Sequence, residues 1–245
     1  MLEVGAVTAQ GRRDHMEDFV RVEQPFAGGP GSLYAAVFDG HGGDAVSRRA
    51  SNELHRLLAA GMASGRPFRD AIREAFREFD DSVSLEPCGS TAAVLLLQGG
   101  HAEVANAGDS HALLVSGAGS ALLTTDHRLS NEGEHRRVVA AGAKVSGPYA
   151  CLPDGRGLMC TRSLGDREFR AIGILAEPDF ASRALRAADE WIVLGSDGVW
   201  DGLEPEAVAA LARSADTARL AAERIRDAAL KANTDNVSVI AIRLP

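Results

Sequence analysis

The chain has 245 residues, a formal net charge of −8, and 45% hydrophobic but only 5% aromatic residues. The acidic balance argues against nucleic acid and anionic membrane as partners, because both attract clustered Lys and Arg. The apolar content is typical of a globular protein whose core is built from Ala, Val, Leu and Ile. No Pro- or Ser-rich linker divides the chain, so we expect residues 1–245 to form a single domain.

The three cysteines, Cys88, Cys151 and Cys160, include no close pair. They therefore predict neither a disulfide framework nor a zinc site, and they fit a reducing compartment. Residues 1–10 lack the basic and apolar segments of a signal peptide. No apolar run approaches the roughly 18 residues that span a bilayer. We expect a cytoplasmic protein and, since no apolar interface stripe is evident, a monomer.

In the N-terminal half, the pattern predicts strands at 2–8, 18–22 and 33–38. Residues 23–32 contain two prolines and three glycines and are typical of a loop. A helix is predicted to begin at Asp44, with apolar residues at helical spacing, and to end at Gly61. A second amphipathic helix is predicted over 68–79. Each helix has an apolar stripe suited to covering a flat surface.

Farther along the chain, strands are predicted at 91–97, 101–107 and 112–115. Their short links favour antiparallel neighbours. A helix at 131–141 is followed by a long, weakly periodic segment at 142–173, and such loops are usually functional. A buried strand at 191–195, helices at 204–212 and 217–232, and a strand at 237–242 complete the chain. The pattern predicts an α+β fold in which helices cover antiparallel sheet.

Carboxylates stand at the ends of several predicted strands. Asp18 begins one strand, Asp39 and Asp197 follow two others, Asp235 precedes the last, and Asp109 is a fifth case. One such residue is ordinary turn chemistry, but five could converge if the strand ends lie side by side. Clustered carboxylates repel one another in a low dielectric. Their oxygens suit a hard cation such as Mg²⁺, Mn²⁺ or Ca²⁺.

Eight short motifs occur in order along the chain: RRDHMED, VFDGHGG, CGSTAA, ANAGDSHALL, TTDH, TRSLGD, GSDGVWD and NTDNVSVI. Together they resemble the motif set of the type-2C, metal-dependent Ser/Thr protein phosphatases, and they run from Gln10 to Ile242. The resemblance implies a four-layer α-β-β-α sandwich of two antiparallel β-sheets flanked by helices. The strand pattern by itself does not give the second sheet.

The resemblance also implies an activity. Water that bridges two divalent metals would attack the phosphorus of phosphoserine or phosphothreonine on a protein. The metals would be Mn²⁺ or Mg²⁺, two per active site, and the family also has a weaker third site. The implied partners are a phosphorylated protein and a cognate Ser/Thr kinase or its targets.

The metal ligands implied by the resemblance are Asp18, Asp39, Gly40, Asp109, Asp197 and Asp235. Asp39 would bridge the two metals, and Asp197 and Asp235 would complete the ligands of one. The Gly40 carbonyl would serve the other metal, with Asp18 near it directly or through water. Asp109 would belong to the third site, shared with Asp197.

Two further residues match catalytic positions of the family. Arg13 matches a phosphate-binding arginine, whose planar fork suits a phosphate, with Arg12 as a competing candidate. His41 matches the proposed general acid that protonates the leaving oxygen, since imidazole titrates near neutrality. The alternative for His41 is a turn histidine.

Other positions stay open. Asp201 fits either the third metal site or the entry to the next helix, and Thr91 either holds a metal-bound water or packs. Asn236 either orients Asp235 or shapes a turn. Asp166 lies in a family motif without an assigned chemical role.

The sequence departs from the family at Ser163, where Ala is common, and at His111, where Arg is frequent. Neither position belongs to the implied ligand set. Residues 142–173 correspond to a flap beside the catalytic cleft, and we expect substrate choice to depend on this segment. The rival hypotheses are a partner-binding module on the same fold and a hydrolase of small phosphate esters.

Overall fold

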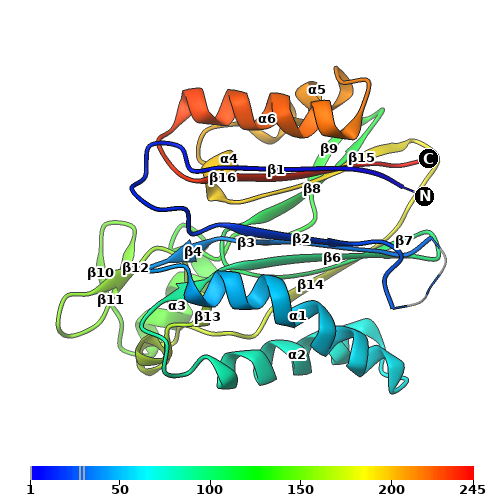
Figure 1. Cartoon of the computed structure of the whole chain (residues 1–245). Helices are drawn as coiled ribbons and strands as arrows, with labels where there is room; N and C mark the ends of the chain where they lie inside the picture. The colour runs from blue at the N-terminus through cyan, green and yellow to red at the C-terminus, as the bar shows by residue number, and fades with distance from the viewer. Residues whose placement is uncertain (1, 28, 30) are drawn as a thin grey trace.

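A computed structural model describes residues 2–27, 29 and 31–245. Two five-stranded antiparallel sheets pack face to face (Figure 1). Sheet I has the strand order β1-β16-β15-β8-β9, and sheet II the order β14-β7-β6-β3-β2. The bounds in sheet I are β1 Glu3–Ala9, β16 Val237–Arg243, β15 Asp189–Gly195, β8 His111–Ser116 and β9 Gly119–Leu122. Those in sheet II are β14 Asp179–Ala184, β7 His101–Ala107, β6 Ala92–Gln98, β3 Leu33–Phe38 and β2 Phe19–Glu23.

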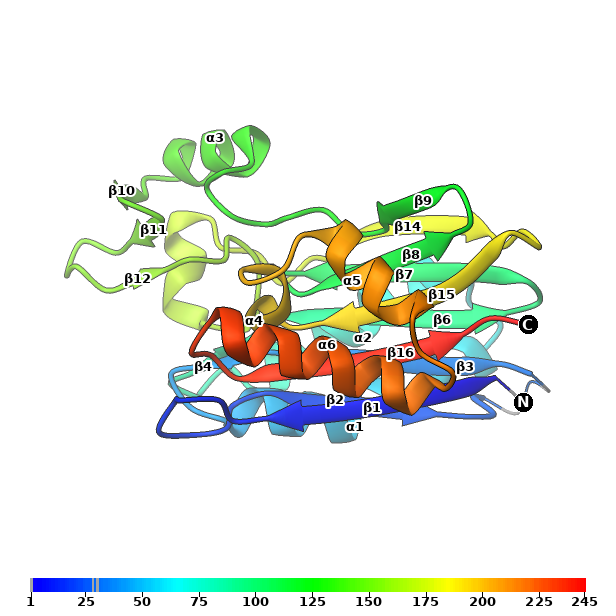
Figure 2. The ribbon, with the colours of Figure 1, turned by 90° about the horizontal axis from the view of Figure 1, so that it is seen from above.

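Helices cover the outer face of each sheet, which confirms the predicted four-layer sandwich (Figures 1 and 2). Helices α1 (Ala45–Ala63) and α2 (Phe68–Ser82) lie on sheet II. Helices α5 (Pro205–Arg213) and α6 (Ala218–Ala232) lie on sheet I, with the short α4 (Asp197–Trp200) at its end. The prediction that Gly61 ends the first helix is wrong. A Cβ at Gly61 would lie 2.9 Å from the Cβ of Ala71, so this glycine permits α1 and α2 to approach closely.

Strand β3 explains why residues 33–38 form an unbroken apolar run. Leu33, Ala35 and Val37 point into the layer between the two sheets. The alternate residues, including Tyr34 and Phe38, pack against α1 and α2. Since both faces of β3 are covered, every position along it is apolar.

The segment predicted as a long loop has more regular structure than expected. It contains the small sheet of β10 (Lys144–Ser146), β11 (Tyr149–Cys151) and β12 (Gly157–Leu158), followed by the 3₁₀ helix η1 (Arg167–Ile172). With α3 (Glu132–Ala140), this small sheet projects from one end of the sandwich (Figure 2). Strands of two or three residues are too short to leave a periodic pattern. The strands β9 and β14, which the sequence pattern also missed, lie at sheet edges and are largely half-exposed.

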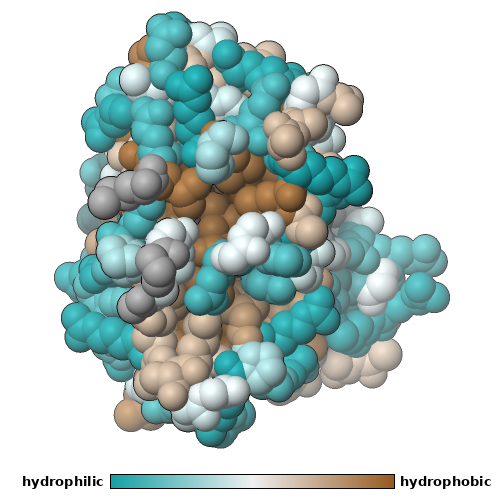
Figure 3. All heavy atoms as spheres, turned by 90° about the vertical axis from the view of Figure 1, so that its right-hand side faces the viewer, coloured by the Kyte–Doolittle hydropathy of each residue, from teal (hydrophilic) through white to brown (hydrophobic). Residues whose placement is uncertain are grey.

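A second small sheet joins β13 (Leu164–Gly165), β5 (Gly89–Ser90) and β4 (Gly40–His41). It connects the end of β3 to the flap, residues 142–173. The chain termini lie at the other end of the sandwich (Figure 1). There a hollow of about 410 Å³ is lined by Leu2, Leu244 and their neighbours, and Figure 3 shows apolar side chains within the polar rim.

Two further features bear on the sequence expectations. All three cysteines are free thiols and are buried. In the part of the chain that the structure describes, no helix combines the length and apolar character needed to cross a membrane.

Candidate active site

A cleft of about 400 Å³ opens at the end of the sandwich beside the flap. Most of the residues singled out by the sequence line it: Arg13, Asp39, Gly40, His41, Asp109, Asp197 and Asp235. Asp18 does not line the cleft. It is 3% exposed and lies close enough to Asp197 and Asp235 for their charges to raise its pKa. Residues from five separated stretches of chain therefore meet at one edge of the two sheets.

Asp39 is held where β3 ends. Its backbone N–H donates to the Thr91 hydroxyl at 3.3 Å, and the Thr91 N–H donates to the Asp39 carbonyl at 2.8 Å. The Thr91 hydroxyl also contacts the Ser110 hydroxyl at 2.7 Å. One carboxylate oxygen of Asp39 accepts from the Asp197 N–H at 3.3 Å. Thr91 thus fixes the backbone that presents Asp39, a role beyond the two that the sequence left open.

The carboxylates of the cleft destabilise one another. Burial raises the pKa of Asp39 and of Asp197, and neighbouring carboxylates act in the same direction. Burial likewise raises the pKa of Asp18 to about 7. The Oδ2 atom of Asp18 is buried without a hydrogen-bond partner. Buried acids without a counter-charge are costly, so this set of hard oxygen donors fits a divalent cation.

Gly40 is required by close packing next to these acids. A Cβ at this position would lie 2.5 Å from both the Glu17 carbonyl oxygen and the Ser47 hydroxyl. Ser47 itself donates to the Glu17 carbonyl at 2.5 Å. Only glycine therefore lets the chain turn from β3 into β4 and bring the Gly40 backbone into the cleft.

Two arginines pair with some of the acids at this end of the sandwich. The Nη2 of Arg13 donates to Asp235 at 2.5 Å. Arg128 donates to Asp109 at 2.7 Å, to both oxygens of Asp201 at 2.6 and 3.1 Å, and to Asp197 at 3.2 Å. Within residues 2–27, 29 and 31–245, no three Asp, Glu, His or Cys side chains are already arranged to hold a metal ion.

Arg128 was not among the predicted site residues. It directly follows the TTDH motif, and nothing in its local pattern separates it from a surface arginine. Asp201 is not the entry to α5, because Glu204 occupies that N-cap position. Its carboxylate instead lies against Arg128, as part of a group with Asp109 and Asp197.

His41 has a carboxylate partner that the sequence did not identify. Its Nε2 lies 2.6 Å from Oδ2 of Asp166, which also accepts from the Ser163 hydroxyl at 2.6 Å. Burial opposes a charge on His41, but the Asp166 carboxylate outweighs this effect and the pKa of His41 is raised. Ser163, where the sequence departs from the family, therefore contacts the carboxylate that pairs with His41.

Asn236 performs both of the roles that were left open. Its backbone N–H donates to Oδ1 of Asp235 at 2.7 Å, which orients that carboxylate. Its side chain donates to the carbonyls of Gln10 and His15 and accepts from the Glu17 N–H. These contacts shape the loop that carries Arg13.

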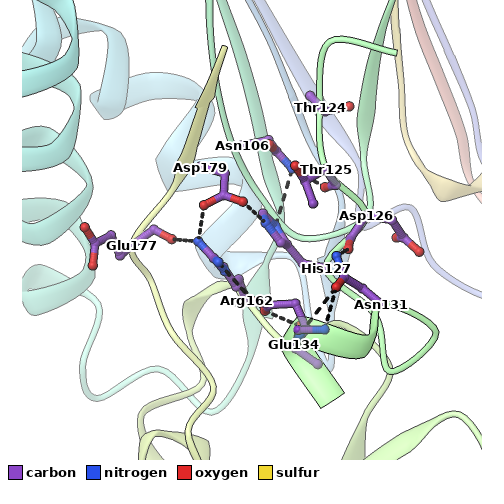
Figure 4. Close-up of polar contacts among 12 residues, drawn as sticks. Asn106, Thr124, Thr125, Asp126, His127, Asn131, Glu134, Arg162, Glu177 and Asp179 are labelled. Carbon is purple, nitrogen blue, oxygen red and sulfur yellow. Dashed lines mark hydrogen bonds and ion pairs between the residues drawn. The ribbon is translucent and has the colours of Figure 1, made fainter. Parts of the chain in front are cut away.

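A buried polar network ties the flap to sheet II (Figure 4). Arg162 donates to Glu134 of α3 at 2.9 Å and to Asp179 of β14 at 2.8 Å. His127 lies on the other side of Asp179, 3.1 Å away, and its Nδ1 accepts from the Gly108 N–H. His127 is fully buried. The network holds the segment before Asp109 and the base of the flap in one arrangement.

Comparisons with known proteins agree with this architecture. The family model described as "Protein phosphatase 2C" matches residues 2–238. A rice protein, "Probable protein phosphatase 2C member 13, mitochondrial", is 31% identical over 252 residues, covering 99% of this chain and 68% of its own length. The human "Probable protein phosphatase 1N" is 34% identical over 267 residues, covering 100% of this chain and 61% of its own length.

A solved structure shares the fold. The serine-threonine phosphatase 2C from Toxoplasma gondii aligns with a TM-score of 0.90 at 19% identity, covering 100% of this chain and 95% of that one. The chain spans 52–77% of the length of eight curated relatives that it matches. The predicted family is confirmed: the chain belongs to the protein phosphatase 2C family.

Proposed function

We propose that this protein is a metal-dependent phosphatase that hydrolyses phosphoserine and phosphothreonine on proteins. The observation that carries the proposal is the cleft itself. It combines mutually repelling buried carboxylates, an arginine at the rim, and a histidine whose pKa is raised. Cation binding, phosphate binding and proton donation are the three tasks of phosphate monoester hydrolysis.

The residues that would hold the cations are Asp39, Asp197, Asp235 and the Gly40 carbonyl, with Asp18 behind them. Two divalent cations bound there supply charge neutralisation for the phosphate and a water of lowered pKa. The Asp197 N–H keeps Asp39 facing Asp197, and Asn236 keeps Asp235 oriented. The protein thereby orients its ligands before any cation arrives.

Arg13 and His41 would act on the substrate. The Arg13 side chain is 58% exposed and its guanidinium has further N–H groups beyond the one on Asp235, so it can bind phosphate oxygens at the rim. Because Nε2 of His41 is engaged with Asp166, the proton on Nδ1 would be the one given to the leaving oxygen of the serine or threonine. Asp166 stabilises the charged imidazole that this role requires.

The lining of the cleft favours a protein substrate. Its flap side is lined by Tyr149, Leu158 and Met159. Apolar side chains beside a charged centre can bind the residues that flank a phosphorylated side chain, which a small phosphate ester lacks. We further propose that the protein acts in the cytoplasm, as a monomer, on substrates of a Ser/Thr kinase.

The test is hydrolysis of a phosphothreonine peptide by the purified protein with Mn²⁺ and with EDTA. We expect turnover that requires metal and is lost in Asp39→Asn, while the exposed α2 variant Asp70→Asn retains it. A folded protein that binds the peptide without turnover in any divalent metal would favour the binding-module hypothesis. Faster turnover of small phosphate esters than of phosphopeptides would favour the metabolite-hydrolase hypothesis.

A further inference from the structure

The positively charged side chain of Arg128 lies among three carboxylates at the edge of the cleft. Its guanidinium contacts the three carboxylates of Asp109, Asp197 and Asp201 through Nε, Nη1 and Nη2. The contact with Asp201 is bidentate, and the Arg128 side chain is only 20% exposed. One side chain therefore donates to four carboxylate oxygens of three acids.

The surroundings hold this guanidinium in place. The Arg128 backbone forms an isolated antiparallel β-bridge with the backbone of Cys160, which lines the cleft on the flap side. The preceding residue, His127, is fixed in the network of Figure 4. A neighbouring hollow of about 250 Å³ is lined by Asp109, Arg128 and Asp201, so the group borders open space on its outer side. Arg128 is thus a built-in part of the site and not a loose surface side chain.

We propose that Arg128 is the resident cation of the Asp109–Asp197–Asp201 group and that it limits the number of divalent cations this edge of the protein binds. The inference rests on the proposed metal-dependent function. A fixed positive charge among these oxygens repels a further dication and uses the lone pairs that would coordinate it. Arg128 also holds one oxygen of Asp197, which fixes how the other is presented to the cleft.

Removal of the guanidinium should convert the group into an all-oxygen cation site. In Arg128→Ala, three carboxylates would face a small space with no counter-charge, an arrangement that a hard dication stabilises. Arg128→Lys keeps the charge but loses the bidentate contact with Asp201. The lysine variant therefore separates the effect of charge from the effect of shape.

The experiment counts Mn²⁺ by titration calorimetry and by the electron paramagnetic resonance signal of free Mn²⁺, with no substrate present. We expect wild type and Arg128→Lys to bind the same number of ions, and Arg128→Ala to bind one more. Its dissociation constant should be at least about tenfold lower than that of any ion that wild type binds at the Asp109–Asp197–Asp201 group. It should disappear in Arg128→Ala/Asp201→Asn, and the exposed variant Arg136→Ala should match wild type.

The outcomes separate this inference from the proposed function. If wild type binds as many ions as Arg128→Ala, with the same affinities, Arg128 does not limit cation binding and the inference is wrong. If Arg128→Lys gains the ion as readily as Arg128→Ala, charge is not the cause, and the inference is also wrong. If neither wild type nor Arg128→Ala binds Mn²⁺, the metal-dependent function fails and the inference fails with it. Circular dichroism identifies an unfolded Arg128→Ala, in which case Arg128→Gln provides the neutral comparison.

Discussion

Glu134 is the acid on which the anchor of the flap depends. The residue is 5% exposed, and its carboxylate accepts from Arg162, Arg137 and Thr161. Burial alone would raise its pKa, but these donors outweigh burial and hold the pKa at about 2, against an ordinary 4.5. At about 1.4 kcal/mol per pKa unit, the difference corresponds to about 3.5 kcal/mol of stability.

Glu134→Gln should therefore lower the free energy of unfolding by about 2–3 kcal/mol at pH 7, since solvent near the arginines screens part of the effect. For a chain of this size, the melting temperature should fall by roughly 4–12 °C. The assay is equilibrium urea unfolding followed by circular dichroism, with thermal melts alongside. The matched control is Glu132→Gln on the same helix, whose side chain is 84% exposed.

The sign of the pH dependence follows from the lowered pKa. The folded protein binds fewer protons on Glu134 than the unfolded chain between pH 2 and 4.5, so the contribution grows as pH rises through that window. It is complete above pH 4.5 and is lost as pH falls toward 2. The difference between wild type and Glu134→Gln should shrink in the same way. A variant within about 0.5 kcal/mol of the control at pH 7 would refute this reasoning.

Three further predictions concern the cleft. Asp166→Asn should lower kcat on a phosphopeptide by about 10²-fold, with a smaller loss on p-nitrophenyl phosphate, whose leaving group needs no proton from His41; equal losses on both substrates would contradict the role of His41 as acid. Asp18→Asn should raise the free energy of unfolding in EDTA by about 1–3 kcal/mol, because it removes a buried acid with a raised pKa, and it should weaken Mn²⁺ binding. Urea unfolding and calorimetry check the two effects, and lower stability in EDTA would count against the argument. Gly40→Ala should lower stability by about 1–3 kcal/mol, because its Cβ would lie 2.5 Å from the Ser47 hydroxyl, and a melting temperature equal to wild type would show that the turn relaxes.

Local patterns in the sequence predicted most of the elements correctly. The apolar run of β3 and the apolar stripe of α2 arise because those residues are buried, and both elements lie where the pattern predicted them. The pattern could not assign strands to two sheets, because alternation reports that a face is buried and not what covers it. It missed β14 because this edge strand has no buried residue and therefore no pattern of burial.

The sequence by itself also determined the chemistry of the site: carboxylates beside glycines at strand ends, an arginine and a histidine, in the order of one family. Only the tertiary structure decided which of these groups meet. His41 lies against Asp166 across 125 positions of sequence, and Arg13 against Asp235 across 222. Arg128 became part of the site because a loop after β9 brings its guanidinium to three acids. Such contacts depend on how the two sheets stack and where the flap is anchored. Residues so far apart along the chain produce no periodic pattern that would predict these contacts.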